Sequence, residues 1–215
     1  MRIRLSLILS AVMAIAFLSS GCRTIYKQNL KEAQAGNTIA QGRVAVSYLI
    51  GYQTPVDYHK AFEWASKAIA AEDPCGYYVL GKLYSSGLGN VRINHAKAKD
   101  YFERAASGLQ IMREDSGSVE ECLLADLYLH GLGVDKRPAS ALFLLDKCSW
   151  RYPPASVLLG DAYLKGIGVK ADINRAAQNY KFAAEKHLPE GQYHFGLLFE
   201  ERSKRYIIHI FRRSG

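Results

Sequence analysis

The histidines are the first residues to test for chemistry, because imidazole serves both as a general base and as a metal ligand. They stand at six scattered positions: His59, His95, His130, His187, His194 and His209. His187 and His194 lie seven residues apart, but Pro189 and Gly191 interrupt the helix that would place them on one side. No nucleophile and base stand at short spacing. We therefore predict no catalytic residues, no metal site and no cofactor, and expect solvated or locally hydrogen-bonded histidines.

Pairs of glycines follow several tyrosines and invite comparison with phosphate-binding loops, which need glycine where the backbone approaches the ligand. None of these pairs is followed by Lys-Ser or Lys-Thr. Each pair also stands between two helical patterns instead of after a strand. We interpret them as structural turns between helices.

Three cysteines besides Cys22 could pair in an oxidising compartment. Cys122 begins one predicted helix and Cys148 ends the next, so in an antiparallel hairpin the two would be adjacent. A bridge between them would close a loop of 27 residues and stabilise the fold by roughly 3–4 kcal/mol. In the alternative, Cys148 fills a small slot that alanine holds elsewhere, and Cys122 is another buried residue. Both hypotheses stay open, with Cys75 as the remaining thiol.

Two rows of residues recur at equivalent places along the chain. The first row is Trp64, Tyr101 and Leu144, and the second row, three residues further on, is Lys67, Arg104 and Lys147. Aromatic residues and arginine often anchor interfaces, so one hypothesis is a recognition surface for an acidic partner. The alternative, which we favour, is that the first row is core between helices and the second row is a solvated face.

The elements that must position these residues are repeated. The pattern Tyr-x-x-Gly-x-Gly occurs three times, at Tyr84–Gly89, Tyr128–Gly133 and Tyr163–Gly168. A weaker copy begins at Tyr48, and a broken one spans Phe195–Phe199. The period is near 36 residues, with one step of 44. Such a period is typical of arrays of helical repeats.

Small residues recur around each copy. One stands three positions before the aromatic residue, in the order Ala45, Gly81, Ala125, Gly160 and Gly196. The second helical stretch carries two more, seven residues apart and so on one face: Ala61 and Ala68, Ala98 and Ala105, Ala141 and Cys148, Ala176 and Ala183. Two helices lined by small residues can approach closely. Each copy is therefore predicted to be a helix hairpin.

The turn residues complete the hairpin. Glycine supplies the positive φ that ends the first helix, and Asp57, Asn94 and Asp172 are placed to cap the second. A single hairpin cannot bury both faces, whereas stacked hairpins cover one another. The sequence therefore predicts an all-α solenoid of stacked antiparallel helix hairpins.

These residues resemble the Sel1-like repeat family, a tetratricopeptide-like group. Its pattern is Leu-Gly-x-x-Tyr-x-x-Gly-x-Gly-Val-x-x-Asp-x-x-Lys-Ala, closed by an aromatic-rich helix, and it is visible in Tyr163–Ala184. The resemblance covers residues 37–202, as four full repeats and one partial repeat. It implies a protein-binding solenoid without enzymatic activity. The cysteine-rich branch of the family uses bridges like the one considered for Cys122 and Cys148, although only one repeat here carries the pair.

Three departures from the family pattern are informative. Gln53 replaces the second turn glycine of the first copy, and Asn90 adds a residue to the second. About eight extra residues separate Ala106 from Cys122, and we interpret residues 107–121 as a loop. Insertions in repeat arrays often contact partners, so this loop, including Met112, either contributes specificity or is simply tolerated.

The first residues carry an export signal. Arg2 and Arg4 precede an apolar stretch, Leu5–Leu18. These fourteen residues would span ~21 Å as a helix, short of the ~30 Å hydrocarbon core. Leu18–Cys22 resembles the lipobox of bacterial lipoproteins, with a departure at Ser19.

We expect residues 1–21 to be a lipoprotein signal peptide and residues 22–36 to form the lipid anchor and a tether or cap helix. The resemblance implies acylation of Cys22, the alternative being an ordinary cleaved signal. Arg23 stands where lipoproteins kept at the inner membrane usually carry Asp. The expected location is therefore the periplasm, on the outer membrane through the Cys22 lipid.

The charge of the chain excludes one class of partner. Without Arg2 and Arg4, 26 basic and 20 acidic residues remain. Four of the basic residues lie beyond Ser203, so the body carries a net charge of only +2. A nucleic-acid-binding domain usually presents a broad basic face. We predict no nucleic-acid partner.

The last residues depart from the repeat pattern. The fifth repeat lacks its second helix, and residues 203–215 include an apolar run, Tyr206–Phe211. Terminal repeats normally end in a polar cap. We interpret this atypical tail as the result of truncation or of a shifted reading frame.

The function we predict is protein binding. Short lipoproteins with Sel1-like repeats include immunity proteins that neutralise phospholipase effectors of type VI secretion, and the resemblance implies this role first. The second hypothesis is a scaffold for envelope assembly or polysaccharide export. The third is a hydrolase or β-lactam-binding protein of the cysteine-rich branch, which the missing nucleophile and the sparse cysteines disfavour.

Overall fold

The computed structural model describes residues 25–112 and 119–200. The predicted signal peptide, Cys22, Arg23 and the tail at 203–215 lie outside these ranges, as does the centre of the insertion, residues 113–118. Every secondary-structure element within the described ranges is helical. The predicted all-α class is confirmed.

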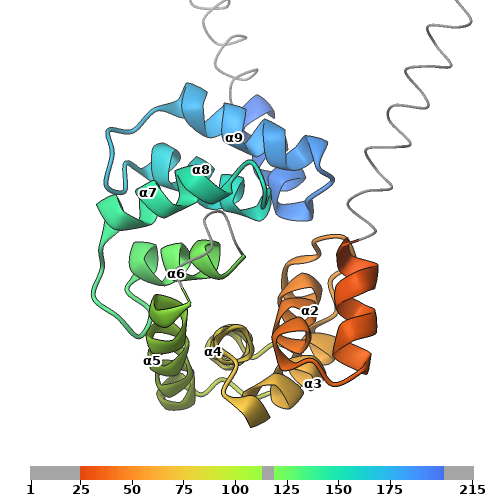
Figure 1. Cartoon of the computed structure of the whole chain (residues 1–215). Coiled ribbons are helices and arrows are strands. Elements are labelled where there is room, and N and C mark those ends of the chain that lie inside the picture. The colour runs from red at the N-terminus through yellow and green to blue at the C-terminus, as the bar shows by residue number, and fades with distance from the viewer. Residues whose placement is uncertain (1–24, 113–118, 201–215) are drawn as a thin grey trace, which may run out of the picture. The chain divides into compact units, whose positions relative to one another are not determined.

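The helices fall into two compact units, one ending at Ile93 and the other beginning at Asn94. The first holds a helix over residues 25–34, α2 (Thr38–Ile50), α3 (Tyr58–Ala68), the short 3₁₀ helix η1 (Ile69–Ala71) and α4 (Pro74–Ser86) (Figure 1). The second holds α5 (His95–Ile111), α6 (Val119–His130), α7 (Pro138–Cys148), α8 (Pro154–Lys165), α9 (Ile173–Glu185) and a helix over residues 189–200. In each unit consecutive helices pair, α2 with α3, α6 with α7 and α8 with α9.

A recurrent backbone bond closes the hairpins. The tyrosine of the motif accepts, at its carbonyl oxygen, a hydrogen bond from the backbone N–H nine residues further on. The three bonds are Asp57 to Tyr48 at 3.0 Å, Arg137 to Tyr128 at 2.9 Å and Asp172 to Tyr163 at 2.8 Å. Between the two ends the chain turns through residues of positive φ, such as Gly166 at 68°. The spacing between the motif tyrosine and the next helix is therefore a requirement of the turn.

Side-chain caps start the second helices, as predicted. Asp57 accepts from the N–H of Lys60, and Asn94 from that of Lys97, each at 3.0 Å. Asp172 accepts from the N–H groups of both Asn174 and Arg175, each at 3.0 Å. These bonds satisfy donors that have no partner inside the helix. The start of α7 has no such side-chain bond and uses Pro138 instead, whose fixed φ suits the first turn.

The small residues of the second helices are buried, and they bring the paired helices close together. The two series predicted from spacing are all buried: Ala61, Ala98, Ala141 and Ala176, and Ala68, Ala105, Cys148 and Ala183. The first helix of a hairpin also carries a small residue where it contacts the second helix. A Cβ at Gly160 would collide with the ring of Tyr180, which packs directly on the α8 backbone.

The second turn glycine lets each turn pack on the preceding second helix. A Cβ at Gly168 would lie 2.7 Å from Cβ of Pro138, and a Cβ at Gly89 would lie 2.6 Å from the carbonyl oxygen of Tyr58. Both partners begin their helices. The equivalent Gly133 instead meets the backbone of Phe102, seven residues into α5. The longer repeat is therefore accommodated by a shift along α5.

The prediction that residues 107–121 form a loop is wrong at both ends. The helix α5 continues to Ile111 and has 17 residues, against 11 in α3 and in α7. The helix α6 then begins at Val119. Burial of Leu109 explains the extension, because this side chain packs in the core only if the helix continues past Ala106. Residues 113–118 lie outside the described ranges.

The helix over residues 25–34 covers the start of the first repeat. Its Ala33 is buried in one apolar cluster with Ala40 and Val44 of α2, and Leu30 packs against the same cluster. At its other end, the ring of Tyr26 meets that of Tyr48 edge to face, with centroids 6.1 Å apart. The described part of residues 22–36 is thus an integral cap of the first hairpin.

Candidate partner-binding surface

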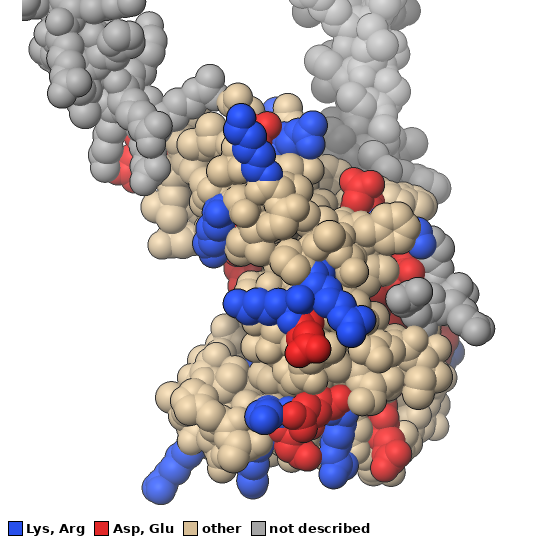
Figure 2. All heavy atoms as spheres, turned by 90° about the vertical axis from the view of Figure 1, so that its left-hand side faces the viewer, with Lys and Arg blue, Asp and Glu red and all other residues tan. Residues whose placement is uncertain are grey.

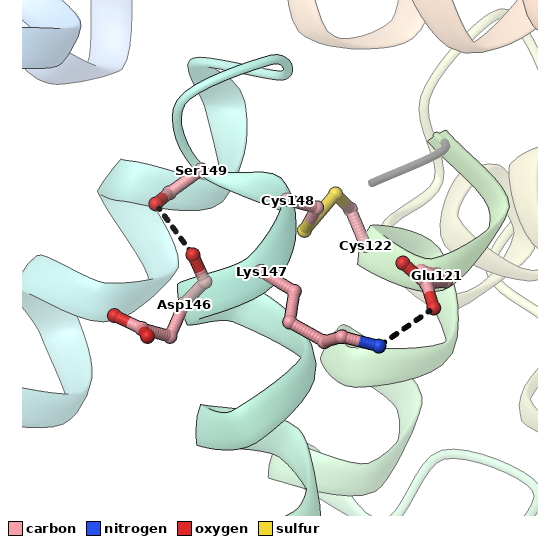
Figure 3. Close-up of a disulfide and its surroundings, with 6 residues drawn as sticks. All are labelled: Glu121, Cys122, Asp146, Lys147, Cys148 and Ser149. Atoms are coloured by element: carbon pink, nitrogen blue, oxygen red, sulfur yellow. Dashed lines mark hydrogen bonds and ion pairs between the residues drawn. A yellow bond between two sulfur atoms is a disulfide. The ribbon is translucent and has the colours of Figure 1, made fainter. Parts of the chain in front are cut away.

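A disulfide joins the first and last turns of the α6–α7 hairpin. The Sγ atoms of Cys122 and Cys148 are 2.17 Å apart and their Cα atoms 6.2 Å apart (Figure 3). Both residues are buried, and Cys148 also occupies the slot that alanine holds in the other repeats. The two hypotheses from the sequence are thus compatible in this fold, because one cysteine can fill the small slot and reach its partner. Cys75, the cysteine of α4, is buried in the first unit.

An ion pair lies beside the disulfide. The Nζ atom of Lys147 is 3.9 Å from Oε1 of Glu121, whose side chain is almost fully buried. The same Nζ lies 5.2 Å from the ring centroid of Phe143, one turn earlier in α7. In Figure 3, Lys147 reaches across to α6, while Asp146 points to the other side of α7. The charge of Lys147 is therefore held between a carboxylate and an aromatic ring.

The first of the two rows predicted from the sequence, Trp64, Tyr101 and Leu144, is buried or half-buried. Trp64 is half-buried against the cluster formed by Ala33, Ala40 and Val44. Tyr101 is half-buried in the second unit, and Leu144 is buried there. Leu144 is thus enclosed in its unit, while Trp64 and Tyr101 each keep part of their surface in contact with solvent. They do not offer a surface of stacked rings to a partner.

The basic row is exposed in each unit, and every member has a local partner. Lys67 lies over the ring of Trp64, with Nζ 4.4 Å from its centroid. Arg104 lies 3.4 Å from Asp100, one turn earlier in α5. Lys147 has the partners described above. The exposed pair of Arg104 and Asp100 contributes little stability, whereas Lys147 is tied to a buried carboxylate.

Two exposed aromatic side chains of the third repeat stand where sequence reasoning did not place them. Phe143 on α7 is 64% exposed, and Trp150, two residues after that helix ends, is 71% exposed. The guanidinium of Arg151 lies 5.4 Å from the Trp150 ring centroid. Met112, predicted as a partner-binding residue, lies just past the end of α5 and is 37% exposed. A position-by-position comparison of the repeats would have singled out Phe143 and Trp150.

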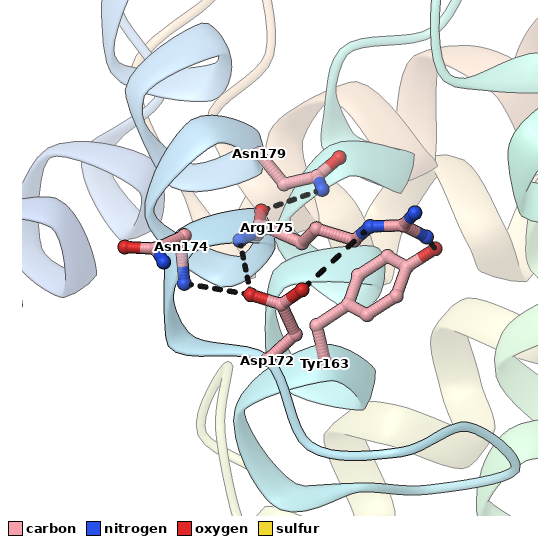
Figure 4. A network of polar contacts seen from close by, with 5 residues as sticks. All are labelled: Tyr163, Asp172, Asn174, Arg175 and Asn179. Atoms are coloured by element: carbon pink, nitrogen blue, oxygen red, sulfur yellow. Dashed lines mark hydrogen bonds and ion pairs between the residues drawn. The ribbon is translucent and has the colours of Figure 1, made fainter.

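The turn tyrosines form a second set of cation–ring contacts. The guanidinium carbon of Arg175 lies 5.3 Å from the ring centroid of Tyr163, and its Nη1 donates to the Tyr163 hydroxyl at 3.2 Å (Figure 4). This hydrogen bond raises the pKa of the Arg175 guanidinium. Its Nε also lies 3.7 Å from Oδ2 of Asp172. The network ties the end of α8 to the start of α9, and its role is to hold the turn.

Two further tyrosines are held as neutral donors. Burial, followed by a hydrogen bond with Tyr48, raises the pKa of Tyr26 to about 12. Burial, followed by a hydrogen bond to Asp161, raises the pKa of Tyr180 well above its usual range. The hydroxyl of Tyr180 donates to Oδ1 of Asp161 at 2.5 Å, and its ring stacks on that of His194 at 5.0 Å. These groups link successive helices instead of converging on one reactive centre.

Positive and negative charges are interleaved on the face that Figure 2 shows. In Figure 2, lysine and arginine side chains lie next to acidic ones across the visible face. Residues 25–112 and 119–200 contain no group of three or more histidine, cysteine or acidic side chains that could hold a metal ion. Within the same ranges no helix is both long and apolar enough to cross a bilayer. The exclusion of nucleic acid stays a prediction.

Comparison with known proteins identifies the repeats. The Sel1 repeat model matches residues 38–73, 76–108, 121–147 and 153–188. The Sel1-repeat-containing protein YjcO of Escherichia coli K12 is 28% identical over 187 residues, which cover 84% of this chain and 76% of YjcO. An ERAD-associated E3 ubiquitin-protein ligase component of Arabidopsis thaliana, HRD3B, is 35% identical over 106 residues, which cover 49% of this chain.

The shared segment is a small part of some of these relatives, only 15% of the length of HRD3B. Among solved structures, the Sel1 repeat protein of Oxalobacter formigenes is 28% identical, with a TM-score of 0.42, and the match covers 75% of this chain and 63% of that one. The four matched segments make up more than half of the present chain, and three of them cover the paired helices α2 and α3, α6 and α7, and α8 and α9. The chain therefore belongs to the Sel1 repeat family.

Proposed function

We propose that this chain is a periplasmic, lipid-anchored binding protein that neutralises a phospholipase effector delivered by type VI secretion. The coarser part of this statement is established, since the chain is a Sel1-repeat protein-interaction module. Proteins of this family are generally non-enzymatic scaffolds. The location and the partner are the proposal.

The exposed side chains of α7 carry the binding part of the proposal. Phe143 and Trp150 place two aromatic rings in water on a hairpin that a disulfide and an ion pair hold in shape. Tryptophan is among the residues that contribute most to protein interfaces, whereas it contributes little to stability when exposed. Such a surface supports binding of a folded protein partner better than it supports catalysis.

The resemblance supplies the specific role. The short apolar leader and the lipobox-like Leu18–Cys22 support export and acylation, which lipoprotein immunity proteins with Sel1-like repeats also undergo. A fatty-acid label should enter the wild-type protein and should be lost in Cys22→Ser. Labelling that persists in this variant would contradict the lipid anchor. It would leave the binding function untouched.

The partner can be tested by affinity capture. The chain from Cys22 onward is used as bait in native periplasm, the bound proteins are identified by mass spectrometry, and phospholipase activity is measured in the mixture. We expect recovery of a phospholipase whose activity falls on binding. Recovery of export or cell-wall machinery would instead favour an envelope-assembly scaffold. Turnover of a β-lactam reporter by the purified protein would favour the hydrolase alternative.

A further inference from the structure

Four side chains form one exposed strip along α7 and the turn that follows it, which we call the α7 face: Phe143, Lys147, Trp150 and Arg151. Phe143, Lys147 and Trp150 follow one another at spacings of four and three residues, as on one face of a helix, and Arg151 joins them because its guanidinium lies over the Trp150 ring. Each cation lies over a ring of the strip, with Lys147 5.2 Å from Phe143 and Arg151 5.4 Å from Trp150. The strip alternates apolar and positively charged groups.

The other repeats show that the fold does not need rings at these positions. The positions equivalent to Phe143 hold Glu63, Asp100 and Gln178, and those equivalent to Trp150 hold Ala70, Ser107 and Glu185. All six are exposed. The other three repeats therefore fold with polar or small residues at these two positions. The two rings of the third hairpin expose apolar surface to water without a structural reason within their own repeat.

The strip is also held rigidly. Cys148, one residue after Lys147, is bonded to Cys122 of α6, and Lys147 is paired with Glu121 of the same helix. After the helix ends, the N–H groups of Arg151 and Tyr152 both donate to the carbonyl oxygen of Cys148, at 3.1 and 2.8 Å. A side chain already fixed in its bound geometry loses less entropy when a partner docks. The backbone that carries the strip is therefore preorganised, as expected of a binding surface.

The charges of the strip select the chemistry of the partner. Two of its four residues are cations and none is an anion. The Glu121 carboxylate, 3.9 Å from Lys147, is almost fully buried, and Asp146 points to the other side of the helix (Figure 3). A basic partner would be repelled, whereas carboxylates on either side of an apolar side chain would complement both kinds of group. Aromatic rings beside arginine also favour a protein partner with a side chain to bury.

We propose that the α7 face is the recognition surface of this protein and that it takes an acidic protein segment with aromatic or aliphatic side chains between its carboxylates. This inference rests on the chain being a protein-binding module, but not on the partner being a phospholipase. It assigns the binding to one repeat out of four. The other repeats then serve as internal controls.

The test uses two double variants of the chain from residue 22 onward, both carrying Cys22→Ser so that they stay in solution. The first, Phe143→Gln with Trp150→Ser, installs residue types that other repeats carry at these positions. The control, Gln178→Ala with Glu185→Ser, changes the same two positions in the fourth repeat. Circular dichroism and thermal melting establish that both remain folded. A third variant, Arg151→Glu, reverses one charge of the strip.

The probe is a library of random 16-residue peptides displayed on phage and selected on the unaltered protein. We expect enrichment of peptides rich in Asp or Glu with interspersed apolar residues. Their affinity should fall about tenfold or more in the first variant and in Arg151→Glu, and it should not change in the control. Peptides selected without acidic residues, or peptides that bind the first variant equally well, would overturn the assignment to the α7 face.

Two further outcomes separate the inference from the proposed function. If vesicles containing phosphatidylglycerol, and not peptides, bind the protein through Phe143 and Trp150, the surface is a membrane contact and the inference is wrong. If a phospholipase is captured equally by the wild type and by the first variant, the proposed function survives and the α7 face is not its site. If acidic peptides bind the face but no phospholipase is captured, the inference holds alone.

Discussion

Two glycines, Gly160 and Gly196, occupy the same repeat position, but only one of them is required by the packing around it. Gly160 of α8 lies under the ring of Tyr180, whereas a Cβ at Gly196 would meet nothing within 4 Å. Glycine in a helix costs about 1 kcal/mol relative to alanine. The glycine in α8 is retained in spite of this cost because the ring of α9 needs the space.

Gly160→Ala should therefore destabilise the protein and Gly196→Ala should not. The added methyl group in α8 must displace the Tyr180 ring, and overpacking of this kind costs about 1–3 kcal/mol. The same change at Gly196 should be neutral or stabilising by up to about 1 kcal/mol through helix propensity. Urea unfolding followed by circular dichroism measures both. Equal effects of the two substitutions would show that the contact with Tyr180 does not constrain α8.

Tyr180 should make stability depend on alkaline pH. Its folded pKa is raised by burial and by the hydrogen bond to Asp161, so above the ordinary tyrosine pKa of about 10 the unfolded chain loses a proton that the folded chain keeps. Stability that is present below pH 10 is therefore lost as the pH rises further. Tyr180→Phe should flatten this decline and should cost about 1–3 kcal/mol at neutral pH. A slope identical to that of the wild type would rule out the raised pKa.

At the scale of the elements, the turn glycines do two separable jobs. Gly166 and Gly133 both have φ near the left-handed minimum, 68° and 64°. The nearest atoms to a Cβ at Gly166 would lie 3.4 Å away, an ordinary contact, whereas at Gly133 the Cβ would collide with the backbone of α5. The first glycine therefore serves only to reverse the chain. The second also allows the turn to approach the preceding helix.

Gly133→Ala should consequently be more destabilising than Gly166→Ala. The left-handed conformation alone costs a non-glycine residue about 1–2 kcal/mol, which is the loss expected at Gly166. At Gly133 the collision adds to that, and we expect a loss larger by at least about 1 kcal/mol. In the first repeat, Gln53 holds the position equivalent to Gly133 with φ at 65°, so it shows the same backbone conformation in a residue that has a side chain. Chemical denaturation of the two variants gives the difference, and equal losses would mean that the turn does not press on α5.

At the scale of the whole molecule, the state of the cysteines links the fold to the compartment in which the chain works. The bridge between Cys122 and Cys148 lies within the second unit, and Cys75 lies buried in the first. Disulfides persist in the periplasm and are rare in the cytosol. An exported chain should therefore keep this bridge, and a chain retained in the cytosol should not.

Thiol counting in denaturant tests this expectation on protein purified from the periplasm and carrying Cys22→Ser. We expect one reactive thiol before reduction and three after it. Removing the bridge by Cys122→Ala together with Cys148→Ala should lower the free energy of unfolding by roughly 3–4 kcal/mol. Alanine at 148 keeps the small side chain that the other repeats have there, so the loss reports the bridge and not the packing. Three reactive thiols before reduction would show that the bridge does not form.

The hairpins, their turns and their caps were predictable from the sequence alone, because each depends on residues within about ten positions of one another. In the first and fourth repeats, a tyrosine, a glycine three residues later and a carboxylate six residues after that mark the turn and the start of the next helix. The small residues seven apart predicted the close approach of paired helices for the same reason. The Cys122–Cys148 pair was also within reach of this local reasoning, as one of two open hypotheses.

The partner-binding surface was not predictable in the same way. Spacing left two hypotheses open for Trp64 and Leu144, a surface row or core between helices. The structure buries Leu144 and half-buries Trp64, while Phe143 and Trp150 face the solvent. The extension of α5 past Ala106 was missed as well, because it depends on where Leu109 finds a buried site. Periodicity determines which residues share a face of a helix, but only the packing of helices distant in the chain decides which face is covered.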